Sequence, residues 1–296
     1  MDVSIIIINF NTKELTINCI DSIISQTVNI TYEIIVCDNA SIDGSQRAIQ
    51  LKFPNIVLIE SAENLGFGKA NNLGAEVAQG RYLFFLNSDT VLLNNSIDAL
   101  YSFNIANHER LNIGVSGGIL LDKNGFETLS FGPLPSLFTT LISILGLVPR
   151  FTKMTKSELK DFISNGYLEV GYITGADLFI SKSIFKAIGG FDPNIFMYYE
   201  ESDLQLRLNH AKFHNYVIAA TKIVHLEGAS LNQLSTNNKK RLIITKSIFY
   251  YFRKHSKSLA FKLFKILFFS IRITTLLYFS YSWKEKWKYL LQILKA

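Results

Sequence analysis

The first third of the chain alternates short apolar runs with helix-length segments, and this alternation restricts the fold more than any other feature. The strand-like runs are Val3–Phe10, Tyr32–Cys37, Ile56–Glu60 and Tyr82–Leu86. The helical patterns between them are Thr12–Gln26, with Thr12 as N-cap, Gly44–Lys52 and Gly68–Gln79. Strands separated by helical segments predict right-handed βαβ units. We therefore predict an α/β fold with a Rossmann-like, mostly parallel central sheet flanked by helices.

The sequence lacks the usual loops for dinucleotides and for nucleoside triphosphates. No G-x-G-x-x-G follows the first strand, and Gly66-Phe67-Gly68 lacks the third glycine and the spacing. No Walker A motif occurs either. These absences disfavour a dinucleotide cofactor.

Polar residues end two of the predicted strands. Asn87-Ser88-Asp89 follows the buried-looking run Tyr82–Leu86, and Asp38 ends the second strand. Open α/β sheets bind ligands at the carboxyl ends of their strands. A divalent cation that holds phosphate oxygens needs one or two carboxylates there. The alternative for each residue is a side-chain-capped turn, which Asn and Asp commonly form.

The α/β rhythm continues with a helix at Ser96–Asn107 and a strand at Gly114–Leu121, and then breaks over residues 131–165. Within the break, Leu137–Val148 is apolar but too short to span a bilayer, which needs about 20 residues. It is either a core or interfacial helix, or a loop that touches an acceptor or a membrane. Strands are expected again at 171–180 and 216–219, around a helix that the acidic segment 198–203 opens and that continues to about residue 212.

Charge is distributed unevenly along the 296 residues. Residues 239–296 hold 14 Lys and Arg against one acid, whereas residues 1–238 hold 16 against 23. A basic, aromatic tail of this kind suggests an anionic membrane surface or nucleic acid. The two cysteines, Cys19 and Cys37, favour a reducing compartment over a disulfide framework. The first residues carry no signal-peptide pattern, and we expect none.

Eight sequence pieces, in order, resemble the family 2 glycosyltransferases of GT-A fold, especially the bacterial rhamnosyltransferase-like branch. They are Ile5–Asn11 (IIIINFN), Val36–Ser45 (VCDNASIDGS), Asn64–Gly74 (NLGFGKANNLG), Leu83–Asp89 (LFFLNSD), Gly175–Phe179 (GADLF), Gly189–Pro193 (GGFDP), Tyr198–Arg207 (YYEESDLQLR) and Val224–Ser230 (VHLEGAS). Each piece alone is weak, but their shared order makes the resemblance specific. It covers residues 3–230 and leaves the tail outside.

The resemblance implies a site for a nucleotide-diphosphate sugar donor. Asp38 matches the acid that binds the nucleobase, and Phe10 is placed to stack on the base. The other residues implied to bind the donor are Gly66, Asn72, Asn87, Ser88, Gly175 and Ala176. Asp177, next to this small-residue loop, is a weaker candidate for contact with a sugar hydroxyl.

A divalent cation, Mn²⁺ or Mg²⁺, is implied as cofactor, because a diphosphate leaves readily only when its developing charge is neutralised. Asp89 matches the last acid of the family's D-x-D motif and is the expected metal ligand. Asn87 replaces the first acid and offers no charge. His225 matches a position where some relatives supply an imidazole ligand, which suits Mn²⁺ better than Mg²⁺; a simple hydrogen-bonded histidine is the alternative.

Catalysis with inversion requires a base that removes the proton of the acceptor hydroxyl. In the family's E-D-x-D pattern the second acid is the base, and that register falls on Glu201, one methylene longer than Asp. Glu200 is implied to orient the acceptor or the base, and Asp203 to cap or brace the helix. Repulsion among three acids would raise one pKa and help a base to act near neutrality.

The tail is predicted to be a second region, residues 238–296, beside a catalytic domain of residues 1–237. Lys262, Lys265 and Arg272 interrupt the apolar run 259–281, which argues against a membrane span. Trp283, Trp287 and Tyr289, mixed with Lys284, Lys286 and Lys288, suit lipid headgroups. We expect a basic amphipathic helical anchor on the cytoplasmic face of the plasma membrane and no nucleic-acid binding. A helix packed on the body is the alternative.

These observations predict a metal-dependent, inverting glycosyltransferase. It would move a sugar from a nucleotide diphosphate, with L-rhamnose implied first, to a hydroxyl of a surface-polysaccharide precursor, such as a polyprenyl-diphosphate-linked oligosaccharide. One alternative is a nucleotidyltransferase, which would carry a basic Gly-rich loop where this chain has Ile8–Asn11. Another is a nucleotide-sugar-binding subunit without turnover, suggested by Asn87 and Glu201.

Overall fold

The computed structural model describes residues 1–146, 154–226, 237–277 and 282–295. The strands are β1 (Val3–Asn9), β2 (Tyr32–Asp38), β3 (Val57–Glu60), β4 (Tyr82–Asn87), β5 (Thr90–Leu92), β6 (Ile113–Leu121), β7 (Phe131–Gly132), β8 (Tyr167–Val170), β9 (Tyr172–Ile173), β10 (Asp177–Ser181) and β11 (His214–His225). The helices are α1 (Lys13–Gln26), α2 (Ser45–Lys52), α3 (Phe67–Val77), α4 (Ser96–Leu111), α5 (Leu137–Ile144), α6 (Lys156–Asn165), α7 (Lys182–Ala187), α8 (Glu200–His210), α9 (Asn237–His255), α10 (Ser258–Arg272), the 3₁₀-helix η2 (Ile273–Leu277) and α11 (Trp283–Lys295).

The large sheet has the strand order β3-β2-β1-β4-β10-β6-β11-β5, with β8 beside β11. Strands β3, β2, β1 and β4 are parallel, as are β6 and β11. Strand β10 runs antiparallel to both β4 and β6. The predicted α/β class with a Rossmann-like central sheet is confirmed, and its parallel half is the part that the strand–helix alternation specified.

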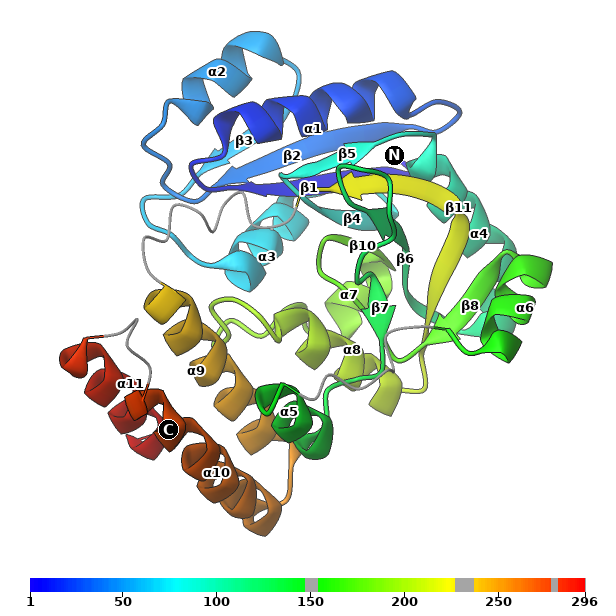
Figure 1. Ribbon diagram of the computed structural model, residues 1–296. Coiled ribbons are helices and arrows are strands. Elements are labelled where there is room, and N and C mark those ends of the chain that lie inside the picture. The colour runs from blue at the N-terminus through cyan, green and yellow to red at the C-terminus, as the bar shows by residue number, and fades with distance from the viewer. Residues whose placement is uncertain (147–153, 227–236, 278–281, 296) are drawn as a thin grey trace.

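Helices cover both faces of the sheet (Figure 1). Because side chains alternate along a strand, β1 sends Ile5 and Ile7 to one face and Ile6 to the other. The first face packs against α1, α2 and α4, and the second against α3, α7 and α8. Both clusters are built from completely buried Ile, Leu, Val and Phe, which explains the near-continuous apolar runs of β1 and β4.

The tail forms a third layer of helices, drawn in orange and red in Figure 1. Aromatic residues of α9 and α10, with Tyr289, Leu290 and Ile293 of α11, make a core of their own. Tyr199 and Leu206 from the start and middle of the body's α8 pack against this core, as do Leu137 and Leu141 of α5. Residues 239–277 and 282–295 are therefore packed on the body rather than extended from it.

Several predicted boundaries change. The expected strand over residues 171–180 is broken between β9 and β10, and Leu137–Val148 is helical only to Ile144. Thr12 precedes α1 but its side chain does not cap the helix, because its hydroxyl donates to Asn9 Oδ1 instead, at 2.8 Å. Helix α6 and strands β5 and β8 were not expected. Residues 147–148, 227–230 and 278–281 of the predicted segments lie outside the described residues.

Candidate active site

The ends of three neighbouring strands bring Asn9, Asp38 and Asn87 to one edge of the sheet. Asn9 pairs with Asp38, and Ile8 pairs with Asn87, across β2-β1-β4. Asn9 Nδ2 donates to Asp38 Oδ2 at 2.5 Å. Because parallel strands end together, residues that are far apart in sequence form one polar floor.

Asp38 is buried and both of its carboxylate oxygens already accept hydrogen bonds. Oδ1 accepts from the Ser41 amide and from Gln46 Nε2, each at 2.8 Å. The turn expected as the alternative for Asp38 is therefore formed. Phe10 directly follows β1 and is half-buried. The next residue, Asn11, donates its amide to Ser41 Oγ at 2.9 Å and so connects the end of β1 to this turn. Contact of Asp38 or Phe10 with a nucleobase stays a prediction.

Asn87, Asp89 and His225 meet at the same edge. His225 Nε2 lies 3.3 Å from Asp89 Oδ1 and 3.3 Å from Asn87 Nδ2. The antiparallel pair β11–β5 makes this contact, since it sets His225 opposite Thr90. Asp89 and the His225 side chain are largely buried, and His225 Nδ1 is buried without a partner among the described residues.

This donor set fits a hard divalent cation. A carboxylate oxygen and an imidazole nitrogen face each other, and Mg²⁺ and Mn²⁺ commonly take one or two protein ligands plus phosphate oxygens of the substrate. Within the described part of the chain, no group of three or more His, Cys, Asp or Glu side chains forms a ready-made metal cage. Among the described residues, Asp89 and His225 are the candidate ligands, with uncharged Asn87 beside them.

Ser88 joins this edge to the start of α1. Its hydroxyl lies 3.1 Å from Thr12 Oγ1, and both Thr12 and Thr16 donate to Asn9 Oδ1 at 2.8 Å. All four side chains are buried. The network fixes Ser88 between the strand ends. The sequence did not indicate Asn9 and Thr12, two members of this network, as site residues.

Gly66 and Asn72 contact the body's own backbone. Gly66 has φ +80°, and a Cβ there would lie 2.1 Å from the Phe196 carbonyl oxygen, so a larger residue is excluded. Asn72 Nδ2 donates to the Phe191 carbonyl at 2.8 Å, and Asn72 Oδ1 accepts from the Phe191 amide at 2.9 Å. Both residues hold the loop after α7 against α3, and their contact with a nucleotide stays a prediction.

Gly175 and Ala176 connect the strand-end group to the acidic segment. The Asn87 amide donates to the Ala176 carbonyl at 3.0 Å. A Cβ at the preceding residue, Gly175, would lie 3.7 Å from Glu201 Cβ. The segment between β9 and β10 thus contacts both Glu201 and the Asn87–Asp89 turn. Asp177, the weaker candidate, is completely buried in the sheet, where burial raises its pKa well above the ordinary value.

The acidic segment begins with a strained turn. Tyr198 and Tyr199 have φ of 66° and 71°, a left-handed conformation that costs a non-glycine residue on the order of 1 kcal/mol or more. The turn places Glu200 and Glu201 in the first turn of α8, where the helix dipole favours negative charge. Strain that is retained at this point indicates a conformation held by its surroundings.

Glu200 and Glu201 are acids with raised pKa values. Burial raises the pKa of Glu200, and the neighbouring Glu201 charge adds to the rise. Burial also raises the pKa of Glu201, although hydrogen bonds oppose it, including one donated by Tyr172 Oη to Oε1 at 2.9 Å. The Oε2 atoms of both glutamates are buried without a protein partner in the described structure. Glu201 therefore has one oxygen held in place and one oxygen available for a proton.

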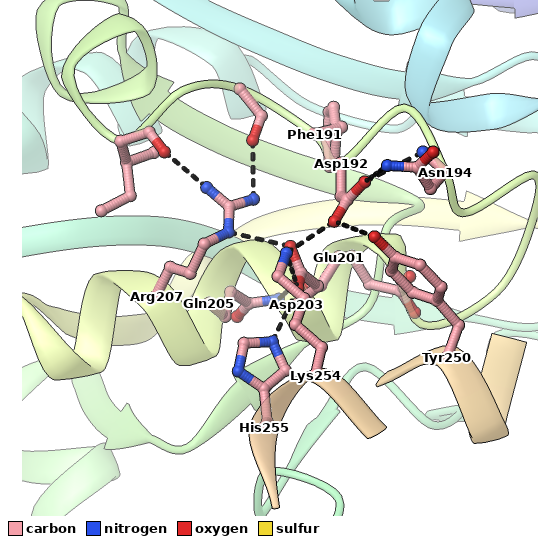
Figure 2. Close-up of polar contacts among 12 residues, drawn as sticks. Phe191, Asp192, Asn194, Glu201, Asp203, Gln205, Arg207, Tyr250, Lys254 and His255 are labelled. Carbon is pink, nitrogen blue, oxygen red and sulfur yellow. Dashed lines mark hydrogen bonds and ion pairs between the residues drawn. The ribbon is translucent and has the colours of Figure 1, made fainter. Parts of the chain in front are cut away.

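Asp203 lies in a cluster of cations from two helices (Figure 2). Its Oδ2 accepts from Arg207 Nε at 2.8 Å, and its Oδ1 accepts from Lys254 Nζ at 2.6 Å and His255 Nε2 at 2.7 Å. Burial alone would raise the pKa of Asp203, but the hydrogen bonds from His255 and Lys254 and the Arg207 charge lower it to about 2. Because both oxygens are bound, Asp203 links the first turn of α8 to α9.

The cluster extends to the loop before α8. Lys254 Nζ also donates to Asp192 Oδ2 at 2.6 Å, and Tyr250 Oη donates to the same oxygen at 3.1 Å. Arg207 donates to the carbonyls of Ile188 and Gly190 at 2.6 and 2.7 Å. We call Asp192, Asp203, Arg207, Tyr250, Lys254 and His255 the α8–α9 clamp. No sequence signal pairs these residues, because about 50 residues separate its two halves.

Comparisons with known proteins identify the family and the fold. Residues 4–155, about half of the chain, match the sequence profile of glycosyl transferase family 2. The chain belongs to glycosyl transferase family 2. The Mycobacterium tuberculosis N-acetylglucosaminyl-diphospho-decaprenol L-rhamnosyltransferase is 28% identical over 204 residues, which cover 65% of this chain and 66% of that relative. The chain therefore spans about two thirds of the length of this relative, and the resemblance to the rhamnosyltransferase-like branch is confirmed.

Solved structures show the fold of the family 2 chain to be GT-A, as predicted. The mannosyltransferase PcManGT from Pyrobaculum calidifontis, in complex with GDP-Man and Mn²⁺, covers 99% of this chain and is itself covered to 73%, at 14% identity and a TM-score of 0.57. GalNAc-T7 with UDP, GalNAc and Mn²⁺ is also 14% identical, with a TM-score of 0.61 over 85% of this chain and 50% of that one.

Proposed function

We propose that this family 2 member transfers a sugar from a nucleotide-diphosphate donor to a hydroxyl of a glycan precursor, with inversion. The observation that carries the proposal is that the Gly175–Ala176 segment contacts both Glu201 and Asn87, and that Asn87 lies beside the Asp89–His225 pair. An inverting transfer needs a base on the face of the sugar opposite the departing diphosphate. The donor sugar of this proposal lies between these two groups, which would meet that requirement.

The chemistry follows from the side chains. Asp89 and His225 would hold the divalent cation, which supplies neutralisation of the diphosphate charge when bound. Tyr172 holds Glu201 Oε1, and Oε2 takes the proton of the acceptor hydroxyl. A bond forms between the acceptor oxygen and the anomeric carbon as the bond from that carbon to the diphosphate breaks. The raised pKa of Glu201 strengthens it as a base near neutrality.

The donor residues of this proposal are those at the strand ends and in the adjoining loops: Phe10, Asp38, Gly66, Asn72, Asn87, Ser88, Gly175 and Ala176. Glu200 is proposed to act beside Glu201, and Asp203 to brace their helix. L-Rhamnose is the first donor sugar to examine, because the Mycobacterium relative is named an L-rhamnosyltransferase. The acceptor in that name is a sugar joined by a diphosphate to decaprenol, which supports a lipid-linked acceptor here.

We further propose that the tail, residues 239–296, holds the protein at the anionic cytoplasmic face of the plasma membrane. Apolar side chains project into solvent from α5, α10 and α11. They include Phe138, Leu259, Leu263, Ile266, Leu267, Trp283 and Trp287. Lysines on α10 and α11 supply charge that complements anionic lipids. Among the described residues, no helix has both the length and the apolar character needed to cross a bilayer.

Two residues that we expected at lipid headgroups are instead inside the tail. Tyr289 and Lys286 are buried, with Lys286 Nζ donating to the Leu276 carbonyl at 3.0 Å and the Arg241 guanidinium 3.8 Å from the centre of the Tyr289 ring. They lie on the inward face of α11 together with Leu290 and Ile293, at helical spacing. Trp283 and Trp287 are exposed and stay candidates for lipid contact. The division into residues 1–237 and 238–296 stays part of the proposal.

The test is a donor screen by thermal shift, with dTDP-, UDP- and GDP-sugars, each with and without Mn²⁺. We expect one nucleotide class to raise the Tm only when Mn²⁺ is present, and Asp89→Ala to abolish that dependence. Asp161→Ala, at an exposed position of α6, is the matched control. Binding followed by sugar transfer supports the proposal. Binding without transfer favours the binding-subunit alternative, and a response to nucleoside triphosphates instead favours the nucleotidyltransferase.

A further inference from the structure

A hollow of about 280 Å³ lies beside Glu201 and is walled by parts of the chain that the donor site does not use. One wall is the strained turn with Tyr198 and Tyr199, and a second is the segment with Pro133 and Pro135. The third wall is Ile244 of α9, which belongs to the tail. Figure 1 shows α9 and α5 beside α8, where these walls meet.

The hollow contains polar atoms that lack protein partners. Glu201 Oε2 and Tyr198 Oη belong to lining residues, and both are buried without a hydrogen bond in the described structure. A buried polar atom left in this state costs about 1–3 kcal/mol. A sugar hydroxyl can donate to the carboxylate and accept from the phenol, so a carbohydrate in the hollow would satisfy both.

The remaining lining selects against the charged end of a donor. Among the described residues it consists of tyrosine rings, prolines, Ser202 and Ile244, and these include no Lys, Arg or His. Aromatic rings pack well on the C–H face of a sugar, whereas a diphosphate here would lose its water without gaining a cation. The hollow therefore suits a neutral sugar ring.

A cation is available at the rim. Lys240 Nζ lies 5.9 Å from the centre of the Tyr198 ring, on the outer side of the turn. Lys240 precedes Ile244 by four residues on α9, so the two side chains share one helical face. A sugar ring against Ile244 would leave a phosphate attached to that sugar within reach of Lys240.

We propose that this hollow binds the acceptor sugar, with Ile244 against its ring, Tyr198 on a hydroxyl, and Lys240 on a phosphate attached to it. The inference rests on the proposed function and names the acceptor side of the same site. It makes the tail part of the catalytic centre as well as a membrane anchor. The α8–α9 clamp supports this role, since Lys254 and His255 fix α9 to the turn of α8 that carries Glu201 (Figure 2).

The experiment separates acceptor binding from donor binding. Purified protein comprising residues 1–296 transfers radiolabelled sugar from the donor found in the screen to a lipid extract of host-cell membranes. Half-saturation, the concentration that gives half of the maximal transfer rate, is measured for the extract and for the donor. Ile244→Trp should fill the hollow and raise half-saturation for the extract about tenfold or more, with that for donor unchanged. Tyr198→Phe should raise it by roughly fivefold without loss of volume. Lys246→Trp, at an exposed position of α9, is the matched control and should match wild type.

Lys240→Gln tests the phosphate contact. It should raise half-saturation for the extract, and the difference from wild type should shrink as salt is added, because salt screens an exposed charge pair. Removal of the lipid diphosphate from the extract by mild acid should abolish the effect of Lys240→Gln but keep that of Ile244→Trp. Loss of both effects would indicate that the hollow contacts the lipid carrier rather than the sugar, and it would overturn the assignment.

The outcomes distinguish this inference from the proposed function. Wild-type protein that neither binds a nucleotide sugar nor transfers it would overturn the proposed function, and this inference with it. Active wild-type protein with the same half-saturation for extract in Ile244→Trp would overturn the inference alone. An equal rise for donor and extract would do so too, because it would indicate a distorted site rather than a filled acceptor hollow.

Discussion

At the scale of single residues, the surroundings of Glu200 and Glu201 disfavour the ionised form of both side chains. Each has a carboxylate oxygen buried without a protein partner, and burial raises both pKa values. Asp203, two positions after Glu201, is completely buried but accepts hydrogen bonds from Arg207, Lys254 and His255, and its pKa falls to about 2. Three acids within one helical turn therefore have different chemistry, and the difference comes from partners that the sequence does not place near them.

The raised pKa of Glu201 predicts opposite effects of Glu201→Gln on activity and on stability. Transfer should fall by roughly 10²–10⁴-fold, the usual contribution of a general base. Because the folded-state pKa is raised, folding favours the protonated acid, and the native state loses stability as pH rises through the unfolded-state value of 4.5 and above. Glutamine carries no charge, so the Tm of the variant should exceed that of wild type by an increasing amount as pH rises above 4.5.

Sugar transfer and thermal unfolding, each measured across this pH range, check both halves. Glu76→Gln, an exposed glutamate on α3, is the control and should alter neither. A variant with normal transfer would remove Glu201 as the base. If the Tm difference between the variant and wild type does not grow with pH, the native state does not raise the pKa of the Glu201 carboxylate.

At the scale of secondary-structure elements, α8 is held from outside the parallel sheet. Its first turn follows two left-handed tyrosines, and its acids face the site. The α8–α9 clamp ties this turn to α9 and to the loop after α7. Helix α9 thus contributes to the geometry of the first turn of α8. A substitution in α9 should therefore alter the position of Glu201.

Removal of the clamp lysine should destabilise the protein and loosen α8. Lys254→Met removes the cation shared by Asp192 and Asp203, and hydrogen bonds to charged groups contribute about 1.5–3 kcal/mol each. Asp203 keeps Arg207 and His255, so we expect a loss of about 1–3 kcal/mol in the free energy of unfolding and faster amide exchange at the start of α8.

Urea unfolding and hydrogen exchange test this expectation, with Lys246→Met on the exposed face of α9 as control. The direction in which stability changes with pH can also be predicted. Because the pKa of Asp203 is lowered, its contribution is complete above the ordinary value of 3.8 and is lost as pH falls from there towards 2. Asp203→Asn should therefore destabilise the protein at neutral pH much more than near pH 2. Equal losses at both pH values would contradict the clamp.

At the scale of the whole molecule, our proposals give the tail two roles on different faces. Its inner aromatic cluster packs against Tyr199, at the N-terminus of α8, and against Leu206 of α8, so deletion of residues 239–296 would expose these apolar side chains of the body. Deletion is consequently a poor test of membrane binding. Substitutions on the outer face separate anchoring from folding, since Leu263 and Ile266 of α10 are 55% and 62% exposed.

Leu263→Glu combined with Ile266→Glu should weaken binding to vesicles that contain phosphatidylglycerol by about tenfold or more. Each large aliphatic side chain contributes up to about 1.5–3 kcal/mol when fully removed from water, and the new charges are repelled by anionic lipid. Co-sedimentation with vesicles measures the effect, and added salt should weaken wild-type binding. Leu51→Glu, 74% exposed on α2, is the control. Unchanged vesicle binding by the double variant would move the membrane contact elsewhere.

Much of the parallel half of the fold was predictable. The runs of Val, Ile, Leu and Phe in β1, β2 and β4 are buried on both faces, which produces a sequence signal strong enough to locate each strand to within a residue or two. Strand β11 was underestimated, since only its middle was expected as a strand and its end runs on to His225. Helix α6 has a capping box from Thr155 and Glu158, a local signal that could have located it.

Site residues divide in the same way. The Asn87–Asp89 turn could be assigned to the ligand edge because parallel strands present their carboxyl ends together. Tyr172, Lys254 and His255 could not be assigned, since each meets its acidic partner across 29 to 52 residues with no local pattern. Asn72 resembled a nucleotide contact but holds Phe191, because an amide serves a backbone and a ligand equally well.

The sequence by itself determined the α/β class, the order of the parallel strands' polar ends, the family and the basic character of the tail. These properties depend on periodicity, composition and motif order, which are local and survive without coordinates. Only the tertiary structure decided that Gly175–Ala176 contacts both Glu201 and the turn that carries Asp89, that Asp203 is bound by Arg207 and Lys254, and that α9 lines a hollow beside Glu201. Those facts depend on contacts between distant segments, and the burial that creates them also sets the charge state of each acid.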